Sequence, residues 1–270
     1  MSFFTSLSGM RNATTDLSVI SNNIANAESV GFKKSNAQFA DLVASGSATD
    51  PRKTPGIGAT VSRVSQDFAL GQLEQTGRAL DLAINGDGFI TTTDAISGDL
   101  TFTRNGNLEL VASGELQDAF GNNVQGFPLD AAGVPTTFTP ENVVVPTVNA
   151  GGVVLSSIGI DLRGVVSATY SDGTVEPVAQ IALATFPATG GLQAIGLTKW
   201  EATAESGQPE FGQPGVGNYG QIRSGSLERS NVDLAEEMVA LLGAQRNFQA
   251  NARAIDTATA LTQTVLNLQR

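Results

Sequence analysis

The chain has 270 residues, and its 15 basic and 26 acidic side chains give a formal net charge of −11. It contains no histidine and no cysteine, which excludes disulfides, thiolate metal sites and histidine-based catalysis. The acidic balance argues against nucleic-acid binding, because phosphate recognition needs clustered lysine and arginine. We therefore expect no metal, no cofactor and no small-molecule substrate, and a structural or binding role rather than an enzymatic one.

The N-terminus lacks the basic and apolar regions of a cleaved secretory signal. No stretch approaches the roughly 20 apolar residues that a bilayer-spanning helix needs. A cytoplasmic location and export without a cleaved signal both fit these observations.

The first predicted element is an amphipathic helix from Phe3 to Ala27. Apolar residues recur there at intervals of three, four or seven, which is the helical period. Its apolar seam contains Leu17, Ile20 and Ile24.

The same pattern returns from Asp233 to Leu268. Asp233, followed three residues later by Glu236, resembles a capping box at a helix start. At about 1.5 Å per residue this helix would be roughly 50–55 Å long, so it needs a partner along its whole length. The residues expected on its seam are Leu234, Met238, Leu241, Phe248 and Ile255.

The two terminal segments, residues 1–28 and 231–270, are expected to pair as a coiled coil. Several seam positions are polar, including Thr14, Ser21 and Gln245. Such a pair buries little apolar surface alone, so we expect neighbouring copies of the chain to cover it.

The region between the helices is predicted to be β-structure, which makes the fold class α+β. Residues 73–230 contain short alternating runs typical of a mainly antiparallel sandwich or barrel. Residues 29–72 are expected to connect this domain to the helices, and residues 44–60 and 130–151 to be polar connectors. The predicted hairpin turns are Asn85-Gly86, Asp87-Gly88, Asn105-Gly106, Gly121-Asn122 and Asp172-Gly173.

Motifs that could carry chemistry are weak. The Asn85–Gly88 run lacks the further ligands of a calcium loop. Scattered carboxylates leave a hydrolase as a rival interpretation, although nothing marks two of them as neighbours. Glu236 and Glu237 are explained by the helix dipole alone, and Trp200 is expected in the core.

Four stretches are specific beyond composition. They are LSVISNNIANAESVGFKKS from Leu17, TGRALDLAINGDGF from Thr76, FTRNGNLEL from Phe102, and SGSLERSNVDLAEEMVALLGAQRNFQANARAI from Ser224. Together they resemble the rod, hook and hook-associated family of axial proteins of the bacterial flagellum. Within that family the pattern is most similar to hook proteins, whereas the length, with no large inserted outer domain, resembles distal rod proteins.

The resemblance implies a subunit of a flexible hook that transmits motor torque, with a rigid rod as the alternative. It implies a helical homopolymer whose terminal helices line the core, and neighbouring rod, hook-cap and hook–filament junction proteins. It also implies a location in the flagellum and export through the flagellar type III apparatus without a cleaved signal. Asn22, Asn23 and Asn26 are expected to hydrogen-bond across subunits, the alternative being that they cap and end the first helix.

Overall fold

The structure, a computed structural model, describes residues 2–43, 56–95, 97–130 and 132–268. It is α+β with mainly antiparallel strands, as predicted. The chain divides into two compact units. Unit 1 comprises residues 1–27, 34–67 and 232–270, and unit 2 comprises residues 28–33 and 68–231.

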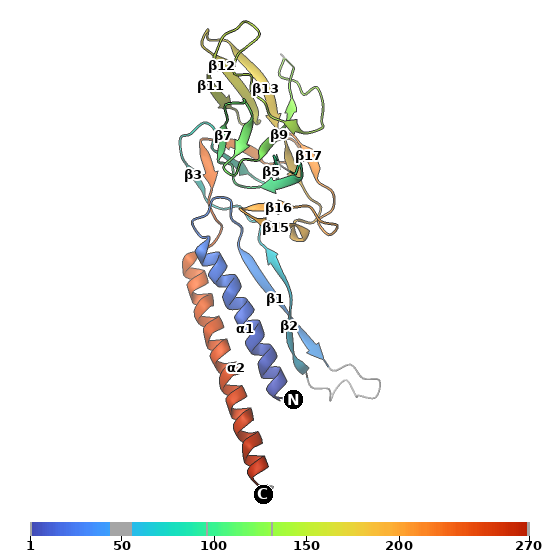
Figure 1. The fold of residues 1–270 in the computed structure, drawn as a ribbon, viewed down its shortest axis with the longest axis vertical. Coiled ribbons are helices and arrows are strands. Elements are labelled where there is room, and N and C mark those ends of the chain that lie inside the picture. The colour runs from blue at the N-terminus through green and yellow to red at the C-terminus, as the bar shows by residue number, and fades with distance from the viewer. Residues whose placement is uncertain (1, 44–55, 96, 131, 269–270) are drawn as a thin grey trace. The chain divides into compact units, whose positions relative to one another are not determined.

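Unit 1 contains both terminal helices, α1 (Ser2–Ala25) and α2 (Leu234–Leu268), of 24 and 35 residues. They lie side by side (Figure 1). The predicted cap of α2 is confirmed, because Asp233 Oδ1 accepts the backbone N–H groups of Ala235 and Glu236 at 2.8 and 3.2 Å. Neither helix, within the described residues, is long and apolar enough to cross a membrane.

Unit 1 also contains an antiparallel pair of strands, β1 (Ser35–Val43) and β2 (Gly56–Gln66), which contacts α1. The prediction of a polar connector at 44–60 is therefore wrong for residues 56–60, which belong to β2. Residues 44–55 lie outside the described part of the chain. The start of β2 was not predicted as a strand because its glycines are typical of loops. Gly58 has φ +130, and a Cβ added there would clash with Ser8 Oγ, so glycine is needed where β2 approaches α1.

Unit 2 is built from short strands and one 3₁₀ turn, η1 (Thr189–Gly191). The strands are β3 (Leu73–Gln75), β4 (Leu82–Asn85), β5 (Phe89–Thr93), β6 (Leu100–Thr103), β7 (Leu108–Leu110), β8 (Leu116–Asp118), β9 (Asn123–Pro128), β10 (Glu141–Asn142), β11 (Leu155–Ile160), β12 (Val165–Tyr170), β13 (Val175–Ile181), β14 (Leu183–Thr185), β15 (Gln193–Gly196), β16 (Lys199–Glu201), β17 (Glu210–Gly212), β18 (Gln221–Ser224) and β19 (Ser226–Glu228).

The main sheet of unit 2 runs in the order β11-β12-β13-β9-β5-β6-β16-β15, and its strand pairs are antiparallel. Two smaller sheets join β18 to β4 and β19 to β3. The last strands before α2 thus pair with the first strands of unit 2.

Two of the predicted hairpin turns are confirmed and others are wrong. Gly121-Asn122 joins the paired strands β8 and β9, and Asp172-Gly173 joins β12 and β13. The Asn85–Gly88 run instead joins β4 to β5, which pair with different strands. Asn105-Gly106 likewise joins β6 to β7, which are not partners. Glycine permits the tight turn in each case, but strand packing decides the partner.

The core of unit 2 has an aliphatic and an aromatic part. The aromatic part contains Phe89, Phe102, Phe186 and Trp200, so Trp200 is a core residue as expected. The aliphatic part includes Val143 and Val145, both fully buried. These valines come from the expected polar connector at 130–151, which also contains β10, so that expectation is wrong in its centre.

Candidate assembly interface

The buried positions of α2 recur every seven residues. Glu237 and Ala244 are buried, and Asn251 and Ala258 are half-buried. Leu241 and Ile255, four residues after two of these positions, are also half-buried. This alternation of four and three residues is the period with which two long helices keep a common contact line.

The matching face of α1 carries small residues. Ala13 and Ile20 are buried. Gly9 lies so close to α2 that an added Cβ would be 2.6 Å from Asn251 Oδ1. Small side chains let the two backbones approach, but they bury little apolar surface.

Most of the expected seam residues lie on or beside this contact line. Ile20 is buried, and Leu17, Ile24, Leu241 and Ile255 are half-buried. Phe248 is about a third exposed.

Leu234 and Met238 are 43% and 50% exposed in the single chain, so they lie off the contact line between α1 and α2, and their place in an interface with neighbouring copies stays a prediction. The buried line begins at Glu237 instead. Apolar pattern reading missed this position because a carboxylate occupies it, and a partner from a distant part of the sequence compensates its charge.

A polar cluster surrounds Glu237. Asn23, on α1, donates from Nδ2 to Glu237 Oε2 at 3.2 Å and to the Ser35 carbonyl at 2.9 Å. Its Oδ1 accepts the Ser35 N–H at 2.9 Å. Lys34 Nζ lies 2.8 Å from Glu237 Oε1 and 3.3 Å from Glu236 Oε2. One carboxylate thus joins α1, the start of β1 and α2.

The cluster shifts two pKa values. The hydrogen bond to Glu237 raises the pKa of Lys34, and this exceeds the opposing effect of burial. The pKa of the Asp16 carboxyl is also raised, first by burial and then by the negative charge of Glu237. Asp16 is therefore an unfavourable neighbour in this cluster when it is ionised.

The three asparagines of α1 have different surroundings. Asn23 is buried and its amide is used within the chain. Asn26 donates from Nδ2 to the Asn22 carbonyl at 2.9 Å in the last turn of the helix. The Asn22 side chain is exposed. Bonds across subunits stay a prediction for all three asparagines, and Asn23 and Asn26 already make hydrogen bonds within one protomer.

Large apolar side chains remain uncovered on unit 1. Phe4 and Val239 are each 71% exposed. A single chain thus leaves apolar surface on both helices and on the β1–β2 hairpin facing solvent. The other exposed members are Phe3, Phe39, Leu42, Val43, Ile57, Val64, Leu234, Met238, Leu242, Phe248 and Leu261.

Unit 2 holds a buried ion cluster that the sequence did not reveal. Lys33 Nζ lies 2.5 Å from Glu228 Oε1, and both side chains are fully buried. Arg104 Nη1 lies 3.3 Å from Glu228 Oε2 and its guanidinium is over the Phe89 ring. Burial lowers the pKa of Arg104, although the Glu228 carboxylate opposes this effect.

This cluster ties together chain segments that enter and leave unit 2. Glu228 Oε1 also accepts the Gly71 N–H at 2.9 Å, and the Glu228 carbonyl accepts the Gly31 N–H at 2.8 Å. Among the described residues, no group of three or more acidic, histidine or cysteine side chains could hold a metal ion.

Three segments of the chain match known families. Residues 4–33 match "Flagella basal body rod protein", residues 83–168 match "Flagellar hook protein FlgE/F/G D1 domain", and residues 223–268 match "Flagellar basal body rod FlgEFG protein C-terminal". The flagellar basal-body rod protein FlgG of Bacillus subtilis is 35% identical over 281 positions, covering 100% of this chain and 99% of the relative. The chain belongs to the flagellar rod and hook protein family. It is a structural component of the bacterial flagellum.

Other rod and hook proteins match along the whole chain as well. FlgG of Borreliella burgdorferi is 33% identical over 282 positions, covering 99% of this chain and 98% of the relative. The flagellar hook protein FlgE of Escherichia coli is 26% identical over 412 positions, with full coverage of both chains. Because this chain has 270 residues, that hook protein carries many additional residues that have no counterpart here.

The three matched segments each supply one member of the buried ion cluster. Lys33 ends the first, Arg104 lies in the second and Glu228 in the third. The family segments thus meet at one point inside unit 2.

Proposed function

We propose that this chain is a flagellar rod subunit, which polymerises with copies of itself into a rigid drive shaft. The match to basal-body rod proteins of nearly equal length carries the proposal, since identity is 35% and 33% there. The hook interpretation expected from sequence motifs has weaker support, because the hook protein of Escherichia coli is 26% identical and much longer. The names of these relatives give no support to a carboxylate hydrolase.

We propose that the terminal helices act as a coiled coil that is completed by neighbouring copies. The seven-residue spacing of buried positions on α2 supports the coiled coil. The exposed Val239, Leu242 and Met238 support the need for neighbours, because burying a large apolar side chain contributes roughly 1.5–3 kcal/mol. Head-to-tail repetition of one such contact produces an open helical filament.

The remaining partners follow from family membership. We expect contacts with adjacent axial proteins of the flagellum, and export through the flagellar type III apparatus without a cleaved signal. The sandwich-like or barrel-like form of residues 73–230, and the role of residues 29–72 as a connecting segment, stay predictions.

Antibody labelling of isolated hook–basal bodies, viewed by electron microscopy, tests the rod assignment. Label confined to the straight shaft supports a rod subunit. Label along the curved segment outside the cell envelope would contradict the rod assignment and support a hook subunit.

Deletion of residues 231–270 tests the coiled coil. The truncated chain should fail to polymerise because α1 loses its partner. Tubes that still form from the truncated protein would contradict the proposed role of α2.

A further inference from the structure

The β15–β16 hairpin of unit 2 ends in an unusual turn. Its two central residues, Leu197 and Thr198, have φ values of +53° and +55°, and these are the non-glycine residues with positive φ among those described. Two-residue hairpin turns with both φ values positive strongly prefer Asn-Gly. A leucine in this conformation costs about 1–2 kcal/mol, so something else must favour its presence.

The Leu197 side chain projects into solvent. It is 61% exposed, and Ile195 beside it is also exposed. The strand β15 is exposed along its whole length and carries no charge. It ends the main sheet, and uncharged, exposed edge strands normally require a cover.

The base of this hairpin is firmly held. Lys199 Nζ lies 2.7 Å from Asp118 Oδ2 with both side chains buried, and Trp200 packs in the aromatic core. Thr103 Oγ1 donates to the Thr198 carbonyl at 2.9 Å. Leu197 is therefore presented on a rigid support, which lowers the entropic cost of docking it.

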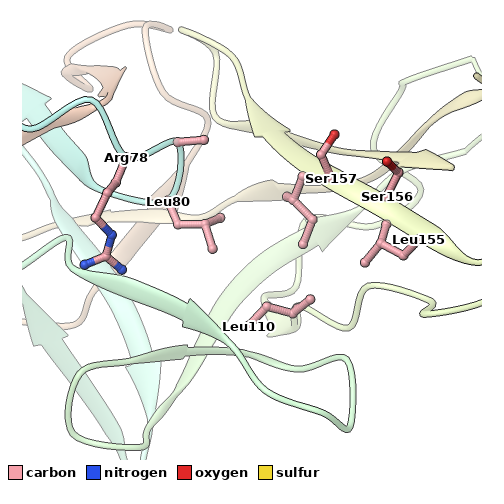
Figure 2. A pocket seen from close by; sticks show the side chains of 8 residues that line it. Arg78, Leu80, Leu110, Leu155, Ser156 and Ser157 are labelled. Carbon is pink, nitrogen blue, oxygen red and sulfur yellow. The ribbon is translucent and has the colours of Figure 1, made fainter. Parts of the chain in front are cut away.

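The opposite end of the same sheet carries an apolar groove. Figure 2 shows Leu80, Leu110 and Leu155 lining it from three separate segments, with Ser156 and Ser157 of β11 beside them. The groove has a volume of about 430 Å³ and Ile158 completes its apolar lining. This size is sufficient for an aliphatic side chain and its neighbours.

The charges beside the two features are complementary. Arg78 lies at one end of the groove (Figure 2). The exposed acid Glu201 ends strand β16 of the hairpin, and the exposed Glu205 lies in the segment that follows. Charge complementarity of this kind selects the orientation in which two copies meet.

We propose that Leu197 of one copy inserts into the Leu80–Leu110–Leu155 groove of the next copy. The two features lie at opposite ends of one sheet path, β15 and β11, so the contact is head-to-tail, the type of contact that builds an open filament when its rotation does not close a ring. This contact covers the uncharged edge strand β15 and explains why a leucine occupies a strained turn position. This inference rests on the proposed function, since it names a contact within the polymer.

Disulfide trapping tests the contact, because the natural chain has no cysteine. An Ile195→Cys/Ser157→Cys variant keeps Leu197 and places thiols on the hairpin and the groove. On mild oxidation of isolated basal bodies it should give a ladder of cross-linked oligomers, since a disulfide needs Cα atoms within about 7 Å. The matched control, Val216→Cys/Ser157→Cys, uses an apolar residue of similar exposure (57%) outside the hairpin and should give no ladder.

Adding Leu197→Gly to the trapping pair separates docking from folding. Glycine accepts positive φ without strain, so the monomer should melt no lower than its parent. The cross-linked fraction should nevertheless fall about tenfold, because the apolar side chain is gone.

Three results would overturn the contact. In the first, basal bodies that contain the variant by antibody labelling give no ladder. In the second, the Val216→Cys control gives a ladder equal to that of the trapping pair. In the third, Leu197→Gly does not reduce the ladder. Each of these leaves the rod assignment standing. Absence of the natural protein from basal bodies would instead overturn the proposed function, and the contact with it.

Discussion

The ammonium group of Lys33 lies 2.5 Å from Glu228 Oε1, and neither side chain is exposed to solvent. Lys33 follows the first helix and Glu228 precedes the last, so 195 positions separate the two in sequence. Arg104 adds a second positive charge to the same carboxylate. One carboxylate, Glu228, thus contacts both buried cations, and the cluster depends on its charge.

Replacing Glu228 by glutamine should strongly destabilise unit 2. Lys33 and Arg104 would stay buried after losing the carboxylate that both of them contact, and breaking such a buried pair costs about 3–5 kcal/mol in the free energy of unfolding. Denaturant unfolding measures this loss. Glu74→Gln is the control, because it removes an exposed pair with Arg229 that contributes at most about 1 kcal/mol. Equal losses for both variants would contradict the importance of the buried cluster.

Gly31 and Gly77 form a matched pair for a backbone test. Their φ values are +70° and +76°, so alanine at either position costs about 1–2 kcal/mol of strain. An added Cβ at Gly31 would also lie 2.6 Å from the Asn105 backbone nitrogen, whereas the one at Gly77 meets open space. Gly31→Ala should therefore lower the free energy of unfolding by at least about 1 kcal/mol more than Gly77→Ala. Equal unfolding curves for the two variants would exclude a close approach at Gly31.

Two aspartate substitutions on α2 distinguish the contact within one chain from contacts between chains. Ala244 is 2% exposed, so Ala244→Asp should separate α1 from α2 and lower the helical circular dichroism of the monomer. Val239 is 71% exposed, so Val239→Asp should leave the monomer unchanged and reduce incorporation into basal bodies several-fold. A Val239→Asp protein that assembles normally would show that this face of α2 is free in the polymer.

Asp16 predicts a pH dependence of unit 1. The pKa of Asp16 is raised in the folded state, so its protonated form stabilises the folded chain. This contribution to the free energy of unfolding is fully present below pH 3.8, the ordinary pKa of the group, and is lost as the pH rises through the folded pKa. Asp16→Asn removes the ionised carboxylate beside Glu237. It should raise the melting temperature at pH 7, by an amount equivalent to about 0.5 kcal/mol for a partly exposed charge. The gain should shrink as the pH falls towards 4, and a gain independent of pH would contradict this assignment.

The helices were predictable because their signals are local. Each depends on apolar spacing within one segment and, for α2, on the Asp233 cap. Antiparallel β-structure between them followed from alternation and turn residues in the same way. The family was predictable because its motifs are continuous stretches of sequence.

The buried charges were not predictable, because their partners are distant in sequence. In the sequence Glu237 looks like an ordinary acidic residue of a first helical turn. Its burial depends on contacts with Lys34 and Asn23, which lie far away in the sequence. Lys33 and Lys34 look like one solvated basic pair, yet they bind different carboxylates. The pairing of β4, the strand that leads into the Asn85–Gly88 turn, was missed for a related reason, since its partner is β18, near the other end of unit 2.

The positions of Lys33 and Lys34 also set an order of folding. Both lysines belong to the first seventh or so of the chain, and their carboxylate partners, Glu228, Glu236 and Glu237, belong to the last fifth or so. A chain that emerges from its N-terminus cannot close either pair until almost all of it is available. Contacts between residues so far apart in sequence form slowly, because closing the long intervening loop costs conformational entropy before the contact stabilises the chain. Neither lysine can therefore reach its carboxylate partner before residues 228–237 are available, which makes both ion pairs late contacts in folding.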